Sequence, residues 1–241
     1  MNCVEDLSLD QIEVVLFDLD GTLLGVDMHR FIPTYLDGLA ARLEDWAHSR
    51  EIVDSMRQAV VDMLSRVDDR MTLEQRLLAR LQNSLAIPPS SYQQALVAFC
   101  RETLPDLQSF VQAHPLARPL LRTCRQRGWR MVLATNPIFP RMVIDARMQW
   151  AGLEDDFFQF VTDYETFRHC KPHVEYFQEV LARLQVPAEA CLMVGNDSWH
   201  DMAACRAGIR TCLLTTWRID HRDTRYPPDW EGTHEEFLEL L

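Results

Sequence analysis

Two carboxylates set two residues apart, Asp18 and Asp20, are the side chains in this sequence best placed to do chemistry. They follow the apolar run at residues 12–17, and Gly21 comes directly after them. Residues two apart on an extended strand point to the same side, so both carboxylates would share one region at the strand's carboxyl end. That edge is where open parallel sheets bind ligands. We therefore expect a nucleophile and a proton carrier here, the alternative being a polar Asp-Gly turn.

Two later segments carry polar groups suited to a phosphoryl group. Thr135 and Asn136 follow the apolar run at 130–134, and a hydroxyl with turn amides at a strand end can hold phosphoryl oxygens. Lys171 stands before Pro172, which we expect at the first position of a helix. Its ammonium group could neutralise a phosphate or a crowded carboxylate. Taken singly, these segments are better explained by ordinary turn chemistry and by a solvated charge.

A fourth segment adds two more acids, Asp197 and Asp201, after the apolar run at 191–194. Carboxylates at the mouth of a parallel strand suit a hard divalent cation such as Mg²⁺. The pattern Ser198-x-x-Asp201 is also that of a helix capping box, so Asp201 has a structural interpretation as well. The sequence therefore favours metal ligation for Asp197 and leaves the two interpretations of Asp201 open.

The charges of these four segments indicate a metal ion. Four carboxylates against one lysine leave three uncompensated negative charges. Two like charges about 4 Å apart repel by about 4 kcal/mol at an effective dielectric constant near 20. A phosphate ester would add about two more negative charges. We expect a divalent cation to offset this crowding.

The elements that must position these residues alternate between strand and helix. Strands are expected at 12–17, 130–134, 157–162, 191–194 and 211–215, and helices at 116–127, 140–151, 173–185 and 199–207. The strands are continuously apolar, which is typical of strands buried on both faces. A capping box at Thr233 begins a short last helix. This alternation predicts an α/β fold, a Rossmann-like parallel sheet with helices on both faces.

The stretch between the first strand and the rest has a different pattern. Phe31, Tyr35, Leu39 and Leu43 recur every four residues, as on an amphipathic helix, and Thr72 begins another capping box. Two prolines at 88–89 break the chain before a further helical run. No strand is convincing within 26–113, so we expect an all-helical cap domain there. The α/β core domain would then comprise residues 1–25 and 114–241.

Together the four segments resemble the motifs of the haloacid dehalogenase superfamily of Asp-nucleophile phosphohydrolases. Its members show the order Asp-x-Asp-Gly-Thr, a strand-end Thr, a Lys before Pro, and a Gly followed by two spaced acids; the insertion after the first motif resembles their helical cap. The likeness covers nearly the whole predicted core. One departure concerns the last motif, where many relatives place Asp directly after Gly195 and this chain has Asn196 followed by Asp197. Which of the two faces a metal therefore stays open.

The resemblance implies a role for each matching residue. Asp18 would attack phosphorus and form an aspartyl-phosphate, and Asp20 would protonate the leaving group and then activate water. Thr135 would hold phosphoryl oxygens with Asn136 beside it, and Lys171 would bind the same group and balance the charge of the nucleophile. The implied ligands of Mg²⁺ are Asp18, the main-chain carbonyl of Asp20, Asp197 and Asp201, the last directly or at one remove.

These roles imply Mg²⁺-dependent hydrolysis of a small phosphate monoester. A proton-carrying residue such as Asp20 favours phosphate esters over carbon–halogen bonds within the superfamily. Alternatives are a phosphotransferase or sugar-phosphate mutase on the same scaffold, and a non-catalytic phosphoacceptor signalling module. The expected partner is a small phosphorylated metabolite.

Composition excludes several other classes of function. The net charge of −12 opposes binding to a phosphate backbone, so no nucleic-acid partner is expected. No apolar run approaches the roughly 20 residues of a membrane span, and the first residues lack the features of a signal peptide. Seven scattered cysteines without a CxxC pair indicate reduced thiols. We expect a cytoplasmic protein.

Overall fold

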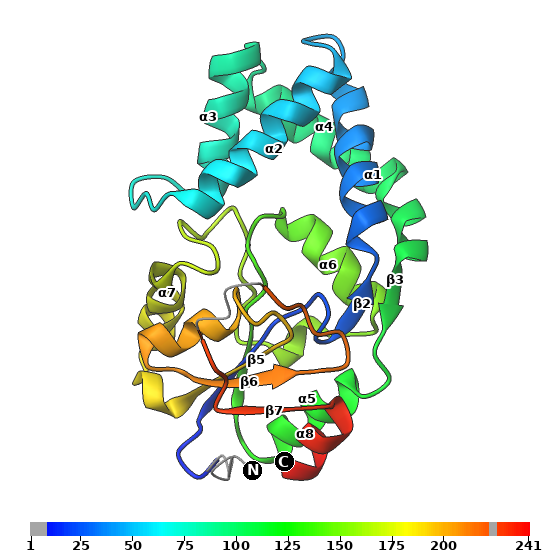
Figure 1. Cartoon of the computed structure of the whole chain (residues 1–241). Helices are drawn as coiled ribbons and strands as arrows, with labels where there is room; N and C mark the ends of the chain where they lie inside the picture. Colours follow the sequence, from blue (N-terminus) through cyan, green and yellow to red (C-terminus); the bar gives the residue numbers. More distant parts are fainter. Residues whose placement is uncertain (1–8, 222–225) are drawn as a thin grey trace.

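A five-stranded parallel sheet forms the centre of the molecule, for which a computed structural model describes residues 9–221 and 226–241 (Figure 1). Its strands, in spatial order, are β4 (Arg130–Leu133), β1 (Val14–Phe17), β5 (Cys191–Gly195), β6 (Arg210–Leu214) and β7 (Trp230–Gly232). Phe17 of β1 is in register with Leu133 of β4 and Val194 of β5. The carboxyl ends of these three strands are therefore level, and the residues that follow them emerge at one edge.

Both faces of the sheet are covered, as the apolar strands predict. All residues of β1 and β5 are buried, and alternate residues belong to two hydrophobic clusters. One cluster joins the sheet to α5 (Ala117–Gln126), α6 (Arg141–Trp150) and α8 (His234–Leu240). The other joins it to α7 (Val174–Leu184) and the 3₁₀ helix η5 (Met202–Ala207). The expected α/β fold class is confirmed.

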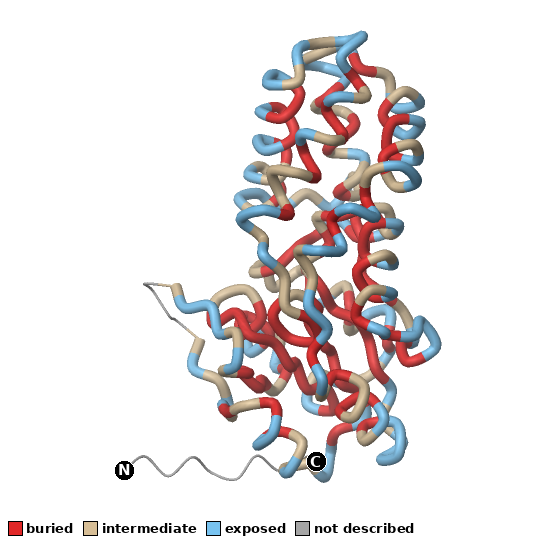
Figure 2. The backbone as a smooth tube through the Cα atoms, turned by 90° about the vertical axis from the view of Figure 1, so that its right-hand side faces the viewer, coloured by how far each residue is buried: buried red, intermediate tan, exposed pale blue. Residues whose placement is uncertain are grey.

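Helices α1 to α4 extend away from the sheet (Figure 1). Their bounds are α1 (Met28–Ala40), α2 (Ser49–Ser65), α3 (Leu73–Leu85) and α4 (Pro89–Glu102), with the 3₁₀ helices η1 (Ala41–Leu43) and η2 (Leu104–Phe110). Their apolar stripes face one another, so buried and exposed residues alternate along each helix (Figure 2). The capping box of α3 is present, with the amide of Gln75 donating to Thr72 Oγ1 at 3.2 Å.

A two-stranded antiparallel ribbon joins these helices to the sheet. It pairs β2 (Leu24–Val26) with β3 (Val111–Ala113). The expectation that 26–113 contains no strand was wrong at both of its ends, because each three-residue strand is too short to show a period. Asp27 follows β2 and caps α1, accepting a hydrogen bond from the amide of Arg30 at 3.3 Å.

Three further expectations differ from the structure, and one strand was not expected at all. The strand expected at 157–162 is absent. Val161 makes one isolated bridge with Leu133, and Phe157 is the last residue of the 3₁₀ helix η3 (Asp155–Phe157). The helix expected at 199–207 is the shorter η5, and strand β7 was missed. Pro172 precedes the N-cap of α7 and so is not its first residue. Short segments of this kind depend on tertiary contacts more than on their own pattern.

Two smaller observations complete the fold. The six cysteines of the described residues are free thiols; Cys3 lies outside those residues. Among the helices of 9–221 and 226–241, none has the length and apolar character needed to cross a membrane.

Candidate active site

Four segments that are distant in sequence meet at one cavity of about 810 Å³ at the carboxyl edge of the sheet. Every residue singled out from the sequence lines it, namely Asp18, Asp20, Thr135, Asn136, Lys171, Asp197 and Asp201. The far side is formed by the ribbon and the start of α1, with Arg30 and Phe110 among the lining residues. The cavity therefore lies between the sheet and the helical insertion.

Lys171 is the central cation of the site. Its Nζ donates to Asp18 Oδ1 at 2.9 Å and to Asp201 Oδ1 at 2.6 Å, and the lysine is 1% exposed. The backbone amide of Lys171 donates to Asn136 Oδ1 at 3.2 Å. Asn136, which was predicted to bind substrate, thus also holds the segment that carries the lysine.

The charged groups of this triad strongly affect one another. Burial raises the pKa of Asp18 to about 7; the ammonium of Lys171 opposes this shift, and the carboxylates of Asp201 and Asp20 add to it. Burial disfavours the charged form of Lys171, but the two carboxylates outweigh burial and raise its pKa above the usual value. More positive charge near Asp18 would favour the ionised, nucleophilic form of that carboxyl.

Asp20 is held by a buried residue that the sequence interpretation missed. Arg147 Nη1 donates to Asp20 Oδ2 at 2.5 Å, and Arg147 is completely buried. Asp20 Oδ1 is buried and has no hydrogen-bond partner among the described residues. Arg147 lies on the buried face of α6 with Val143 and Ile144. A charged residue at a position of the apolar periodicity is the feature of the sequence that could have revealed it.

Asn196 lies on the side of the nucleophile. Thr22 Oγ1 is 3.4 Å from Asp18 Oδ2 and 3.4 Å from Asn196 Oδ1. The side-chain nitrogen Nδ2 of Asn196 donates to the backbone carbonyl of Trp217 at 2.6 Å. Gly21, with φ +85°, permits this approach because a Cβ there would lie 2.1 Å from Asn196 Nδ2.

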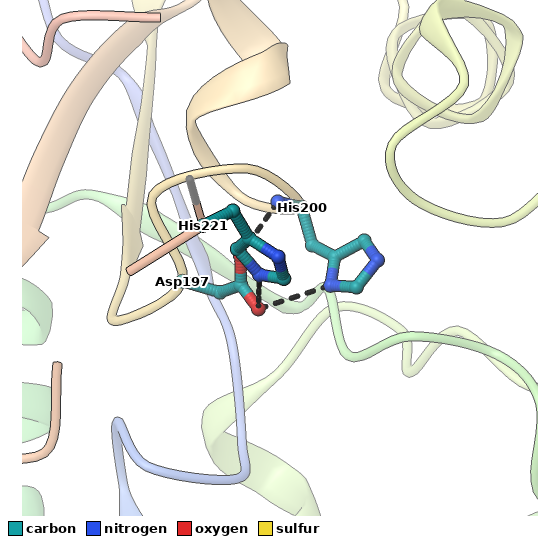
Figure 3. Close-up of side chains that lie close together, drawn as sticks. All are labelled: Asp197, His200 and His221. Carbon is teal, nitrogen blue, oxygen red and sulfur yellow. Dashed lines mark hydrogen bonds and ion pairs between the residues drawn. The ribbon is translucent and has the colours of Figure 1, made fainter. Parts of the chain in front are cut away.

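Asp197 is surrounded by donors of its own (Figure 3). Its Oδ1 accepts from the amides of Trp199 and His200, both at 2.8 Å. Its Oδ2 lies 3.0 Å from His200 Nδ1 and 3.1 Å from His221 Nε2. Although burial acts in the opposite direction, these interactions hold the pKa of Asp197 well below its usual value. Two imidazoles and a carboxylate are also a possible ligand set for a divalent metal.

Both oxygens of Asp201 are used within the protein. Oδ1 binds Lys171, while Oδ2 accepts from the amides of Asn196 and Asp197 at 3.0 and 2.9 Å. Asp201 thus ties the lysine to the loop after β5. Gly195 makes room for it, because a Cβ there would lie 2.2 Å from Asp201 Oδ2.

Thr135 is buried at the end of β4, at 2% exposure. Its carbonyl oxygen accepts from Thr162 Oγ1 at 2.7 Å and from the hydroxyl of Tyr176 at 3.0 Å. These two bonds fix the backbone where the strand turns into the cavity. Thr135 lines the same cavity as the carboxylates.

The residues of this site fit a divalent cation. Asp18 Oδ2 makes a single polar contact within the described residues, the 3.4 Å approach to Thr22. Asp18 and Asp201 share the single ammonium group of Lys171, so one negative charge of these two carboxylates remains uncompensated. Carboxylate and amide oxygens are the ligands that Mg²⁺ prefers. Burial is the main cause of the raised pKa of Asp18, and the neighbouring carboxylates of Asp201 and Asp20 add to it.

The fold and the cavity together define an α/β enzyme that works at the carboxyl edge of a parallel sheet. A family model described as haloacid dehalogenase-like hydrolase matches residues 12–208, and the chain belongs to that family of hydrolases. The resemblance drawn from the motifs is confirmed.

One curated protein and two solved structures are similar to this chain over most of its length. The pyrophosphatase PpaX of Bacillus cereus (strain G9842) is 23% identical over 223 residues, covering 91% of each chain. The structure of CbbY from Rhodobacter sphaeroides in complex with phosphate has a TM-score of 0.60 at 20% identity and covers 94% of this chain and 96% of its own. The hydrolase YfnB of Bacillus subtilis, bound to magnesium, has a TM-score of 0.55 at 20% identity and covers 95% and 98%. The two structural likenesses show the fold.

Proposed function

We propose that the protein is a Mg²⁺-dependent phosphatase that hydrolyses a small phosphate monoester through an aspartyl-phosphate on Asp18, acting in the cytoplasm. The observation that carries this proposal is the position of Asp18, which lines the cavity with Oδ1 bound to Lys171 and Oδ2 in one long contact, to Thr22. PpaX is named a pyrophosphatase and CbbY was solved with phosphate, which supports phosphoryl chemistry. The cavity has room for a small metabolite.

In the first step an oxygen of Asp18 attacks phosphorus and the bond from phosphorus to the leaving oxygen breaks. Asp20 gives its proton to that oxygen, and Lys171 and Thr135 bind the phosphoryl oxygens. In the second step Asp20 takes a proton from water, which attacks phosphorus and releases phosphate from Asp18. These roles use positioning and electrostatics, the main sources of rate in phosphoryl transfer.

The residues that would hold Mg²⁺ are Asp18, the carbonyl of Asp20, and Asn196 or Asp197. The bound ion would supply charge neutralisation around the phosphoryl group. Asn196 Oδ1 lies on the Asp18 side, whereas the oxygens of Asp197 already accept from amides and imidazoles. These contacts favour Asn196, although an acid is the stronger ligand. Because both of its oxygens already accept hydrogen bonds, Asp201 would not bind the ion directly and would instead position Lys171 and the backbone of Asn196.

A screen of phosphorylated metabolites with Mg²⁺ tests the proposal. Asp18→Asn removes the nucleophile and should lower phosphate release by at least about 10³-fold on the best substrate. The matched control is Asp145→Asn, which removes an ion-paired carboxylate of α6 outside the cavity and should keep full activity. If Asp18→Asn matched the wild type, the nucleophile would be misassigned.

The same screen separates hydrolysis from the alternative on this scaffold. With a substrate labelled in the phosphoryl group, a phosphatase releases labelled inorganic phosphate. Transfer of the label to another hydroxyl would identify a phosphotransferase or mutase. A stable labelled protein without turnover would identify a phosphoacceptor module.

A further inference from the structure

Arg147 is the largest fully buried side chain of the described residues. It projects from α6 with its Nη1 on Asp20 Oδ2, and its Nε makes a long contact of 3.4 Å to the carbonyl of Val143. Its Nη2 is buried without a hydrogen-bond partner among the described residues. Within the described residues, this guanidinium forms one ion pair, with the carboxylate of Asp20.

An arginine at this position is not explained by stability. Removing two charges from water is costly, and buried ion pairs can often be replaced by apolar side chains without loss of stability. The neighbours of Arg147 on the buried stripe of α6 are Val143, Ile144 and Met148, so an apolar residue would suit the position. What an apolar residue could not do is bind Asp20.

The ion pair fixes the orientation of the Asp20 carboxyl group through one of its two oxygens. Oδ2 is held by the guanidinium, and Oδ1 is left without a partner in a residue that lines the cavity. A proton carrier acts only when its oxygen is within hydrogen-bond reach of the reacting group. Misplacement by about 1 Å costs about 10²-fold in rate.

The guanidinium also connects Asp20 to the helical insertion. Its carbon lies 4.6 Å from the ring centre of Phe139, in the loop after β4, and 5.6 Å from that of Phe31, on α1. The two rings meet edge to face at 6.0 Å, and Tyr35 of α1 packs on Phe139 at 5.4 Å. A shift of α1 would therefore move the surroundings of Arg147.

We propose that Arg147 is a positioning residue: its ion pair fixes the orientation of the Asp20 carboxyl group that gives its proton to the leaving group, and its contact with Phe31 makes this orientation depend on α1. The inference rests on the proposed function, because it assumes that Asp20 carries the proton. Arg147 itself touches no reacting atom.

The test compares substrates that differ in how much their leaving group needs a proton. In Arg147→Met we expect kcat/KM for glycerol 2-phosphate to fall about 10²-fold. For 4-nitrophenyl phosphate, whose leaving group departs as a stable anion, kcat/KM should fall less than about 3-fold. A burst of nitrophenol should appear, since hydrolysis of the phosphoenzyme also uses Asp20. If Arg147 had only a structural role, the substitution would lower kcat/KM for both substrates by the same factor and would produce no burst.

Matched variants keep the test decisive. Arg141→Met removes an ion-paired arginine from the same helix, away from the cavity, and should leave both values unchanged. Arg147→Lys keeps the charge and should show the same split with a smaller effect; it carries the test if Arg147→Met does not fold. Phe31→Leu should reproduce the split in part.

Each outcome has one meaning. Equal losses for both substrates in folded Arg147→Met or Arg147→Lys would overturn the positioning role. A split in the Arg147 variants without one in Phe31→Leu would overturn the dependence on α1. Failure of the proposed function is seen separately, as activity retained in Asp18→Asn.

Discussion

The two residues after Gly195 have distinct surroundings. Asn196 contacts Thr22, whose hydroxyl also approaches Asp18, while Asp197 contacts His200 and His221. Adjacent residues in a tight turn point in different directions, so only one of them can face the nucleophile directly. Their contacts make Asn196 the better candidate for a ligand of the proposed Mg²⁺ ion.

Two single substitutions distinguish these residues. Asn196→Ala removes an oxygen on the Asp18 side, and we expect the Mg²⁺ concentration for half-maximal activity to rise about 10- to 100-fold. Asp197→Asn keeps an oxygen acceptor for the two amides and should raise that concentration less. Titrations of activity with Mg²⁺ measure both; the reverse order would return the role to Asp197.

Helix α6 shows how one element serves both stability and the site. It carries Arg147 on its buried stripe, and its first amide, that of Arg141, donates to both carboxylate oxygens of Glu165 at 3.0 Å. Its N-cap residue is Pro140, whose side chain makes no capping hydrogen bond. Glu165, in a neighbouring loop, instead accepts the hydrogen bond from the first amide of the helix. Burial raises the pKa of Glu165 to about 7, against the opposing effect of the Arg141 amide.

This shift predicts how stability depends on pH. Glu165 has a higher pKa in the folded protein than its ordinary value of 4.5, so the folded protein binds the proton more tightly. Its contribution to stability is present below about pH 4.5 and is lost as the pH rises through about 7. We therefore expect the change in melting temperature caused by Glu165→Gln to be more favourable at pH 8 than at pH 5, by about 2 °C.

Thermal unfolding of both proteins at the two pH values measures this difference. Glu13→Gln, at an exposed residue directly before β1, is the control and should show no such dependence. A Glu165 variant that lost stability at pH 8 would show that the cap on α6 requires the charge.

For the whole molecule, the important property is the convergence of like charges. Asp18 and Asp20 follow β1 and Asp201 follows β5, so the three carboxylates become neighbours only when the sheet is complete. An overall charge of −12 adds to the repulsion. A divalent cation bound among these groups should therefore stabilise the folded protein as well as its activity.

Mg²⁺ should raise the melting temperature and its removal should abolish turnover. At 100 times the Kd, binding to the folded state alone stabilises it by about 2.7 kcal/mol, or about 5 °C for a chain of this size. Unfolding with and without Mg²⁺, against NaCl at the same ionic strength, measures the effect. Full activity in excess chelator would contradict the proposed dependence on the cation.

By itself, the sequence was sufficient to predict the fold class and the common location of seven site residues. Apolar runs in alternation with helical patterns predict a parallel sheet, and the carboxyl ends of such strands must share an edge. The acids and Lys171 follow those runs directly, so their convergence at one cavity was confirmed. These features depend on local pattern and on general rules of sheet topology.

Only the tertiary structure decided how those residues are paired. The ion pair between Asp20 and Arg147 spans 127 positions, and the contact of Asp201 with Lys171 spans 30. The short ribbon of β2 and β3, the bridge at Val161 and the surroundings of Asn196 likewise depend on contacts between distant segments. A sequence pattern states which residues share a strand or a helix face, whereas a buried charge finds its partner only when packing excludes water around both.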